Sequence, residues 1–171
     1  MKKLVTIIFA LSVALSGSVL HAQNLKFGHI NSSELLQAMP ENDSAQAQLQ
    51  HYAKQLQDQL QTMQTEYNTK LQDYLGQQDN LTDLIKKTKE EELQQLQQRI
   101  QDFQSTAQQD MQKKQNDLLT PIINKANEAI KAVARENGFI YIFDISRGTI
   151  LYYSDKSQDI LPLVKKKLGI Q

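Results

Sequence analysis

The side chains best suited to catalysis or metal binding are scattered along this chain. His29 and His51 have no other ligand-type residues around them at zinc-site spacing, so we interpret both as ordinary surface or partly packed histidines. Three consecutive glutamates at 90–92 begin a helical stretch, where negative charge suits the helix dipole rather than paired acid catalysis. Asp144 and Arg147 are spaced for an ion pair in a turn, not for a catalytic dyad.

Motifs for nucleophilic attack or phosphate binding are also missing from the sequence. No serine or other nucleophile has a recognisable base beside it, and the chain contains no cysteine. The glycines considered for a phosphate cradle are isolated from one another: Gly28, Gly76, Gly138, Gly148 and Gly169. We therefore predict that the protein is not an enzyme and that it has no catalytic residue, cofactor or metal site.

The amino terminus has the three-part pattern of a secretory signal peptide. Lys2 and Lys3 precede an apolar run at 4–15, and small residues then lead to Ala22. The run has roughly 12 residues, short of the 20 or so that span a bilayer, which favours cleavage after Ala22 over a retained anchor. We predict that residues 1–22 are removed and that the exported protein has no stable membrane insertion.

Charge and cysteine content narrow the range of partners. The whole chain has 19 basic and 19 acidic residues. Removal of Lys2 and Lys3 leaves 17 against 19, a net charge of about −2. This balance provides no strongly basic face, so we expect no nucleic-acid partner. The lack of cysteine excludes both a lipid-anchored cysteine at the cleavage site and a disulfide framework.

Residues 41–120 are predicted to form a long helical hairpin, which we call the arm. Apolar residues recur three and four positions apart on both sides of a turn-like stretch at 76–80, and glutamine fills many of the other positions. Each helix has roughly 35 residues, which gives an arm of about 50 Å. The apolar seam between the helices is thin, because Lys70 and Lys114 interrupt it and tyrosine and methionine replace leucine and isoleucine.

Residues 23–40 and 121–171 flank the arm and are predicted to form one small β-rich body. Strands are expected at 25–30, 139–143 and 150–153, and the last two are expected to be joined by a hairpin turn at 144–149. β-Branched and aromatic residues fill these strands, so they are expected to carry the core.

Capping residues and prolines mark the ends of the short helices. Asn31 suits the start of a helix after the first strand, and Asp159 and Gly169 suit the two ends of a final helix. Pro40 either ends the first helix or begins the next one. Pro121 begins a new helical segment or bends the returning arm helix.

Three strands and two short helices leave unpaired sheet edges in a single copy. We therefore expect copies of the chain to associate through the body. The predicted fold class is α+β, mostly α, with the arm inserted in an oligomerising β-body. The candidate contacts are apolar and aromatic strand residues: Phe27, Phe139, Tyr141, Phe143, Leu151 and Tyr153.

The order of these elements resembles the OmpH/Skp family of periplasmic chaperones. The residues that carry the resemblance are 121–139, Tyr141, Asp144, 152–154, 159–160 and 165–168. It is specific in the C-terminal third and only compositional in the arm. The resemblance implies a periplasmic homotrimer with a β-barrel body, whose three arms surround a cavity that holds unfolded outer-membrane proteins without ATP.

Adaptable side chains on the arm are the candidate contacts with unfolded clients. They are tyrosine, methionine and other apolar residues of the arm helices: Tyr52, Leu56, Leu60, Met63, Tyr67, Tyr74, Phe103 and Met111. Packing within the seam is the simpler role for each of them. Basic members of the family are credited with binding acidic lipid or lipopolysaccharide. This mature chain is slightly acidic, so we carry no such site over to it from the resemblance. We hypothesise that client capture depends less on charge here than in a basic relative.

Two other functions fit the same pattern. A structural envelope protein would use the coiled coil as a spacer, or as a docking arm for one folded partner, and would need a tightly packed seam. A membrane-tethered adaptor would retain the leader at its amino terminus. The interrupted seam and its Gln, Met and Tyr content favour the chaperone.

Overall fold

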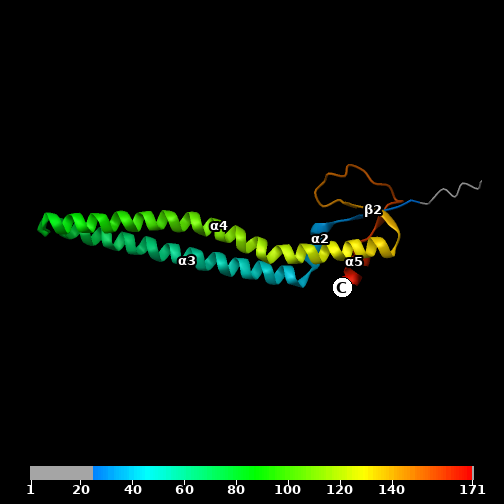
Figure 1. Ribbon diagram of the computed structural model, residues 1–171, viewed down its shortest axis with the longest axis horizontal. Helices are drawn as coiled ribbons and strands as arrows, with labels where there is room; N and C mark the ends of the chain where they lie inside the picture. The colour runs from blue at the N-terminus through cyan, green and yellow to red at the C-terminus, as the bar shows by residue number, and fades with distance from the viewer. Residues whose placement is uncertain (1–24, 171) are drawn as a thin grey trace, which may run out of the picture.

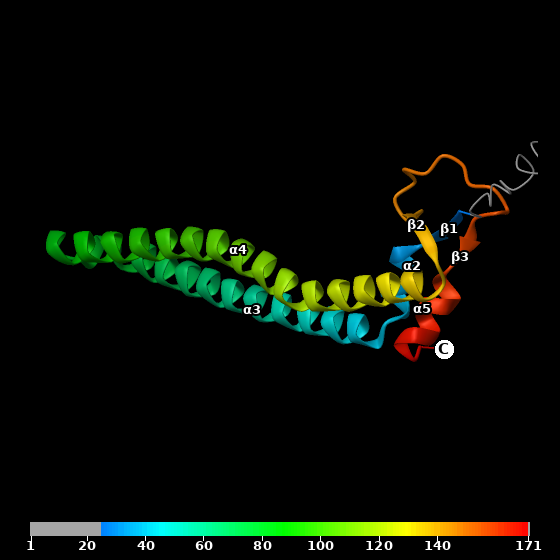
Figure 2. The same cartoon turned by 45° about the vertical axis from the view of Figure 1, so that its right-hand side comes forward.

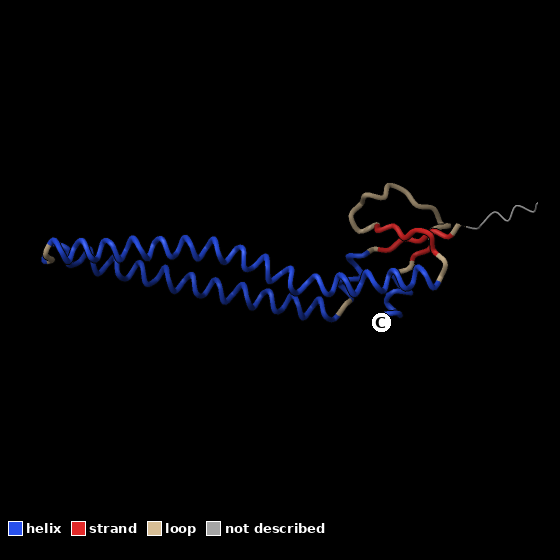
Figure 3. Tube along the Cα trace, viewed as in Figure 1, coloured by secondary structure: helices blue, strands red, loops and turns tan. Residues whose placement is uncertain are grey.

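The computed structural model describes residues 25–170, so the predicted signal peptide lies outside the described residues. Within that range the chain is mostly helical, with long helices and one small sheet at the end of the hairpin (Figures 1 and 3). The elements are β1 (Lys26–Ile30), α2 (Ser32–Ala38), α3 (Pro40–Gln77), η1 (Gln78–Asn80), α4 (Asp83–Glu136), β2 (Phe139–Asp144), β3 (Gln158–Asp159) and α5 (Leu161–Leu168). The predicted α+β class, mostly α, is confirmed.

The arm is an antiparallel pair formed by α3 and the first part of α4. Pro40 lies in the first turn of α3, where its missing N–H costs no helical hydrogen bond. At the far end the chain reverses through η1, and the Thr82 side chain then caps α4 by accepting the Ile85 N–H. The two helices lie side by side along the length of α3 in both views (Figures 1 and 2).

The returning helix does not stop where the arm ends. α4 continues through Pro121 into the body and ends at Glu136. Of the two roles left open for Pro121, the structure excludes a separate helical segment. Figure 2 shows α4 bending as it passes from the arm towards the body. A proline inside a helix lacks one N–H donor and its ring crowds the carbonyl four residues earlier, which favours such a bend.

The sheet of the described chain has the order β2-β1-β3, and β1 runs parallel to both neighbours. The predicted hairpin between 139–143 and 150–153 is therefore wrong. Residues 150–153 lie in a loop that arches away from the sheet (Figure 3), and the third strand is Gln158–Asp159. β-Propensity depends on a partner strand, and both sides of β1 are already taken by β2 and β3.

The core of the body lies between the sheet and the helices α2, α4 and α5. Leu35, Met39, Ile160 and Val164 are each 0% exposed. Gly28 sits on the covered face of β1, where a Cβ atom would lie 2.8 Å from Ile142 Cδ1 and 3.1 Å from Ile160 Cγ2. The absence of a side chain at this position allows the core to approach the strand closely.

The predicted helix ends are largely present. Asn31 Oδ1 accepts the Glu34 N–H at 3.2 Å and caps α2. Asp159 Oδ1 accepts the Leu161 N–H at 2.9 Å at the start of α5. Gly169 follows α5 with φ of 73°, the left-handed conformation in which glycine is unstrained. These local signals place the two short helices that cover the sheet.

Candidate functional site

Polar contacts cross the seam of the arm at several levels. Tyr52 donates its hydroxyl hydrogen to Asp110, and Tyr74 donates to Glu90. Both hydrogen bonds favour the neutral phenol, and each raises the pKa of its tyrosine above the ordinary value of 10.0. Two predicted client contacts, Tyr52 and Tyr74, therefore have partners on the opposite helix. They fasten the two helices together at the base and near the tip.

The apolar part of the seam is closed only in places. Met63 is 8% exposed and Leu96 is 3% exposed, so both pack between the helices. The other predicted client contacts are half-buried, which leaves part of each side chain accessible from solvent. Burial makes Met63 a packing residue of the seam in this conformation. Its predicted client contact would require the helices to separate, and the prediction remains untested.

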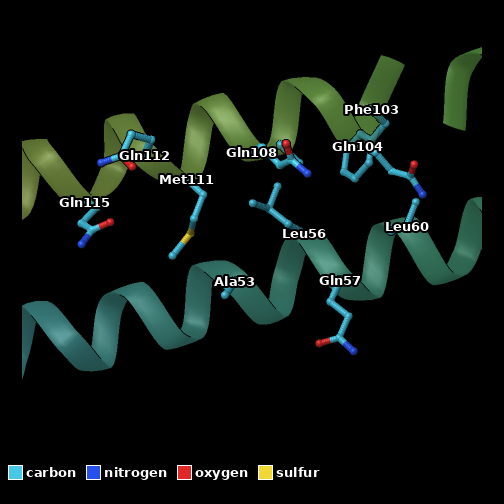
Figure 4. A pocket seen from close by; sticks show the side chains of 11 residues that line it. Ala53, Leu56, Gln57, Leu60, Phe103, Gln104, Gln108, Met111, Gln112 and Gln115 are labelled. Carbon is cyan, nitrogen blue, oxygen red and sulfur yellow. The ribbon is translucent and has the colours of Figure 1, made fainter. Parts of the chain in front are cut away.

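An elongated groove of about 600 Å³ opens between the two helices in the inner half of the arm (Figure 4). We call it the arm groove. Six apolar residues line it: Ala53, Leu56, Leu60, Phe103, Ala107 and Met111. Five glutamines complete the lining: Gln57, Gln104, Gln108, Gln112 and Gln115. Figure 4 shows Leu56 and Met111 pointing into the space between the helices.

Small side chains explain why the arm groove stays open. Ala53 and Ala107 occupy seam positions, but each has only one methyl group to place between the helices. Leucine at such positions would fill a hole on the facing helix. The spacing of apolar residues in the sequence did not by itself indicate a cavity at these positions. Alanine at a seam position is the signal that predicts the gap.

A second apolar surface lies on the outer face of the sheet. Phe27, Tyr141 and Phe143 cluster on this face, and each ring centroid lies 6.1–6.5 Å from the other two. Side chains alternate between the faces of a strand, so Phe27 points away from the core that surrounds Gly28. Their exposed fractions are 37%, 60% and 40%, respectively. We call these three residues the aromatic row.

The loop after β2 adds further exposed apolar residues beside the aromatic row. Leu151 is 97% exposed and Tyr152 is 81% exposed. The loop, Phe27 and Phe143 surround a hollow of about 770 Å³. Tyr153 packs on the His29 ring at a centroid distance of 4.2 Å, and His29 Nδ1 lies 2.9 Å from Ser157 Oγ.

The structure brings together five of the six residues predicted for oligomerisation. The aromatic row, Leu151 and Tyr153 all belong to the outer side of the sheet. Phe139 does not join them, because it packs against the core and under the Lys26 ammonium at 4.2 Å. The register between β1 and β2 shifts at Lys26 and Phe27, which turns Phe139 to the covered face.

The hydrogen-bond partners of Asp144 in the described part of the structure do not include Arg147, the partner that the sequence spacing predicted. Its carboxylate accepts the Ser32 hydroxyl at 2.6 Å and the Ser146 N–H at 3.0 Å. Burial acts to raise the pKa of Asp144, but the hydrogen bonds from Ser32 and Ser146 outweigh it and hold the pKa below 3.8. Among the ion pairs of the described residues, Asp144 has none with Arg147.

Two further properties concern residues 25–170 alone. In this range no helix combines the length and the apolar character needed to cross a membrane. The same residues contain no cluster of three or more His, Cys, Asp or Glu side chains arranged to hold a metal ion.

Comparisons with known proteins agree with this architecture. The family model for outer membrane protein (OmpH-like) matches residues 26–168. The chaperone protein Skp of Yersinia enterocolitica is 30% identical over 161 residues, which are 92% of this chain and 93% of the relative. The crystal structure of an OmpH-like protein from Caulobacter crescentus CB15 superposes with a TM-score of 0.73 at 14% identity, covering 84% of this chain and 83% of that one. The protein is a member of the OmpH family.

Proposed function

We propose that the protein is an ATP-independent periplasmic holdase chaperone, which binds unfolded outer-membrane proteins and prevents their aggregation. The observation that carries this proposal is the open seam of the arm, where apolar side chains lie accessible among uncharged glutamines. A surface of this kind can bind many sequences weakly, because it offers adaptable contacts instead of a shaped pocket. The similarity to the chaperone protein Skp supports the same class of function.

Assembly into a homotrimer with a β-barrel body is the second part of the proposal. The aromatic row, Leu151 and Tyr152 expose contiguous apolar surface, which a monomeric soluble protein rarely leaves uncovered. β2 and β3 are the edges of the sheet and can pair with strands of other copies. Residues 150–153 retain strong β-propensity, and a neighbouring copy would supply the partner strand that a single chain lacks.

Three arms in one assembly would bind more tightly than one. After the first arm engages a client, the second and third contacts are effectively intramolecular and gain from a high local concentration. Each contact can then remain weak enough to be released without ATP. The client leaves when folding or membrane insertion provides a lower free energy.

A combined measurement of solution mass and client protection tests the proposal. The mature chain from residue 23 is added to an unfolded outer-membrane barrel protein as the denaturant is diluted, and aggregation is followed by light scattering. We expect a trimer mass and suppression of scattering at stoichiometric chaperone. A monomer that leaves scattering unchanged would end the proposal.

A matched pair of variants links assembly to protection. Tyr141→Lys introduces a charge into the exposed aromatic row, and we expect it to shift the mass towards the monomer and to weaken protection. Arg147→Ala changes a nearby exposed loop residue outside the row and should leave both properties unchanged. Full protection by a monomeric Tyr141→Lys variant would separate chaperone activity from trimer formation and contradict the avidity argument.

The alternative of a structural spacer or docking arm requires a seam that is packed along its length. The arm groove favours the chaperone over this alternative. A spacer would bind one folded partner with saturation and would not protect unrelated unfolded barrel proteins. Protection of two unrelated clients in the scattering assay therefore supports the chaperone function, and protection of neither supports the spacer.

A further inference from the structure

We infer that the arm groove is a binding site for one extended segment of a client chain, with alternating apolar and uncharged polar side chains. Such a segment is part of one membrane-spanning β-strand of an outer-membrane barrel in its unfolded state. This inference rests on the proposed chaperone function and assigns a place and a chemistry to client capture. The site depends on the small side chains of Ala53 and Ala107.

The dimensions of the arm groove favour an extended chain over a helix. Its lining on α4 runs from Phe103 to Gln115, a rise of about 18 Å along the helix axis. The volume of about 600 Å³ then corresponds to a cross-section of roughly 33 Å². One row of side chains fits this width. A helix of about 10 Å diameter has more than twice that cross-section, so it would lie over the open mouth of the groove and not inside it.

The same length sets the number of residues that can bind. An extended chain rises about 3.3 Å per residue, so about five or six residues span the groove. Successive side chains point to opposite faces, so about three of them enter the groove and the others face solvent. This is the pattern of a barrel strand, in which apolar side chains that will face lipid alternate with polar ones that will face the lumen.

The chemistry of the lining selects an uncharged segment. No residue that lines the arm groove is ionisable, although neighbouring hollows on the arm include Glu66 and Lys70 in one case and His51 and Lys114 in the other. A charged side chain in the groove would lose part of its hydration and find no charged residue in the lining. Membrane-facing strand residues carry no such charge.

The five glutamines can hydrogen-bond to the backbone of an unfolded strand, whose N–H and C=O groups are not yet paired. Each side-chain amide has two N–H donors and a carbonyl acceptor, so it can pair with either group of a peptide bond. A strand that has not yet joined its barrel exposes both kinds of group along its length. Glutamines beside an apolar slot can satisfy these groups without regard to sequence, which suits a chaperone with many clients.

Filling the groove is the direct test. The probe is a fluorescent ten-residue peptide that alternates Leu, Tyr or Val with Thr, Asn or Ser. Ala107→Leu places three more carbon atoms in the groove, and we expect peptide affinity to fall about tenfold. Ala47→Leu is the matched control, because it makes the same change on an exposed arm position outside the groove lining. We expect the control to bind the peptide like the wild type.

Two altered peptides test the selectivity. A peptide of the same composition with its apolar residues grouped together should bind more weakly. A peptide with Glu in place of one inward-facing apolar residue should bind at least tenfold more weakly. Equal affinity for all three peptides would contradict the match between the groove and an alternating strand.

Photocrosslinking provides a readout that does not depend on filling the groove. Gln108→p-benzoylphenylalanine places the reactive group at the groove, and Gln50→p-benzoylphenylalanine places it at an exposed arm position outside the lining. We expect the alternating peptide to label position 108 and not position 50. Equal labelling at the two positions, together with unchanged affinity of Ala107→Leu, would overturn the inference.

The outcomes separate this inference from the proposed function. If the wild type and Ala107→Leu suppress aggregation of an unfolded barrel protein equally, the chaperone function stands and the groove is not its site. If the wild type fails to suppress aggregation, the chaperone function itself fails. The inference is supported when Ala107→Leu weakens both peptide binding and suppression of aggregation, while Ala47→Leu preserves both.

Discussion

The core of the body and the seam of the arm pack apolar residues to different degrees. In the body, Leu35 and Ile160 are 0% exposed because a sheet and several helices surround them on all sides. In the arm, two helices share one seam, so most of each helix surface faces solvent, and Met63 and Leu93 in the seam keep 8% and 9% of their surface exposed. The contrast teaches that stability is concentrated in the core of the body, while the seam of the arm leaves part of its apolar surface accessible.

Truncation of a leucine side chain should show the largest difference in lost stability between the body and the arm. Leu35→Ala removes three carbon atoms from the centre of the body and should cost about 3 kcal/mol of unfolding free energy. Leu71→Ala in the half-buried seam of the arm should cost about 1 kcal/mol or less. Urea unfolding at one protein concentration measures both, since the stability of an oligomer depends on concentration. Equal losses would mean that the arm is as tightly packed as the body.

A Gly→Ala substitution should change stability in opposite directions in the body and in the arm. A Cβ at Gly28 would lie 2.8–3.1 Å from three side-chain atoms of the core, so Gly28→Ala should destabilise by about 1–2 kcal/mol. A Cβ at Gly76 meets nothing within 4 Å and the residue is helical, so Gly76→Ala should stabilise by about 0.5–1 kcal/mol. Thermal unfolding of both variants tests the pair. A stabilising Gly28→Ala would contradict the close approach at β1.

Lowering the pH should reduce the folding stability of the body, because Asp144 becomes protonated. Its pKa in the folded protein lies below the ordinary 3.8, so the unfolded chain binds a proton more readily. The stabilisation by Asp144 is therefore present above pH 3.8 and is lost as pH falls through the lower folded pKa. Asp144→Asn should lower stability at neutral pH by about 1 kcal/mol or less, because the carboxylate is exposed.

The pH dependence of stability shows whether the negative charge of Asp144 is responsible for its stabilising effect. Between pH 6 and pH 3 the wild type should lose more stability than Asp144→Asn, and the difference between them should narrow as the carboxyl group becomes protonated. A constant difference between the two proteins across this range would show that the hydrogen bonds from Ser32 and Ser146 do not depend on the charge of Asp144.

An ion pair on the surface of the arm should have the smallest effect. Lys54 and Asp58 lie 2.9 Å apart, one helical turn from each other, and their side chains are 71% and 62% exposed. Asp58→Asn should cost about 0.3–0.5 kcal/mol at low salt and almost nothing at 0.5 M salt. Circular dichroism during thermal unfolding measures the difference. A loss as large as that of Leu35→Ala would show that charge, and not the seam, holds the arm together.

Client binding should be only weakly sensitive to salt if the arm groove is the site. Its lining contains no ionisable residue, so screening removes little of the interaction free energy. We expect affinity for an unfolded barrel protein to change less than threefold between 50 and 500 mM salt. A steep loss with salt would favour capture by charged parts of the arm and would also contradict the hypothesis drawn from the slightly acidic composition.

Most of the elements predicted correctly have local hydrogen bonds or local packing, and the strands predicted at 25–30 and 139–143 are also present as β1 and β2. The apolar spacing on both sides of residues 76–80 predicted the hairpin, and Asn31 and Gly169 marked helix ends that the structure contains. The strand at 150–153 was predicted wrongly, because β-propensity describes a residue that already has a neighbour. The strand at Gln158–Asp159 has only two residues and carries no pattern of its own.

The sequence by itself determined the long hairpin, its helix ends and its thin seam, because a helical hydrogen bond joins residues only four positions apart. The tertiary structure alone decided that β1 lies between β2 and β3, since its partners, such as Gly28 and Ile142, are far apart in the chain. It also decided that Ala53 and Ala107 line one groove. Spacing along one helix places a residue on the seam, but only the facing helix determines whether that seam is filled or open.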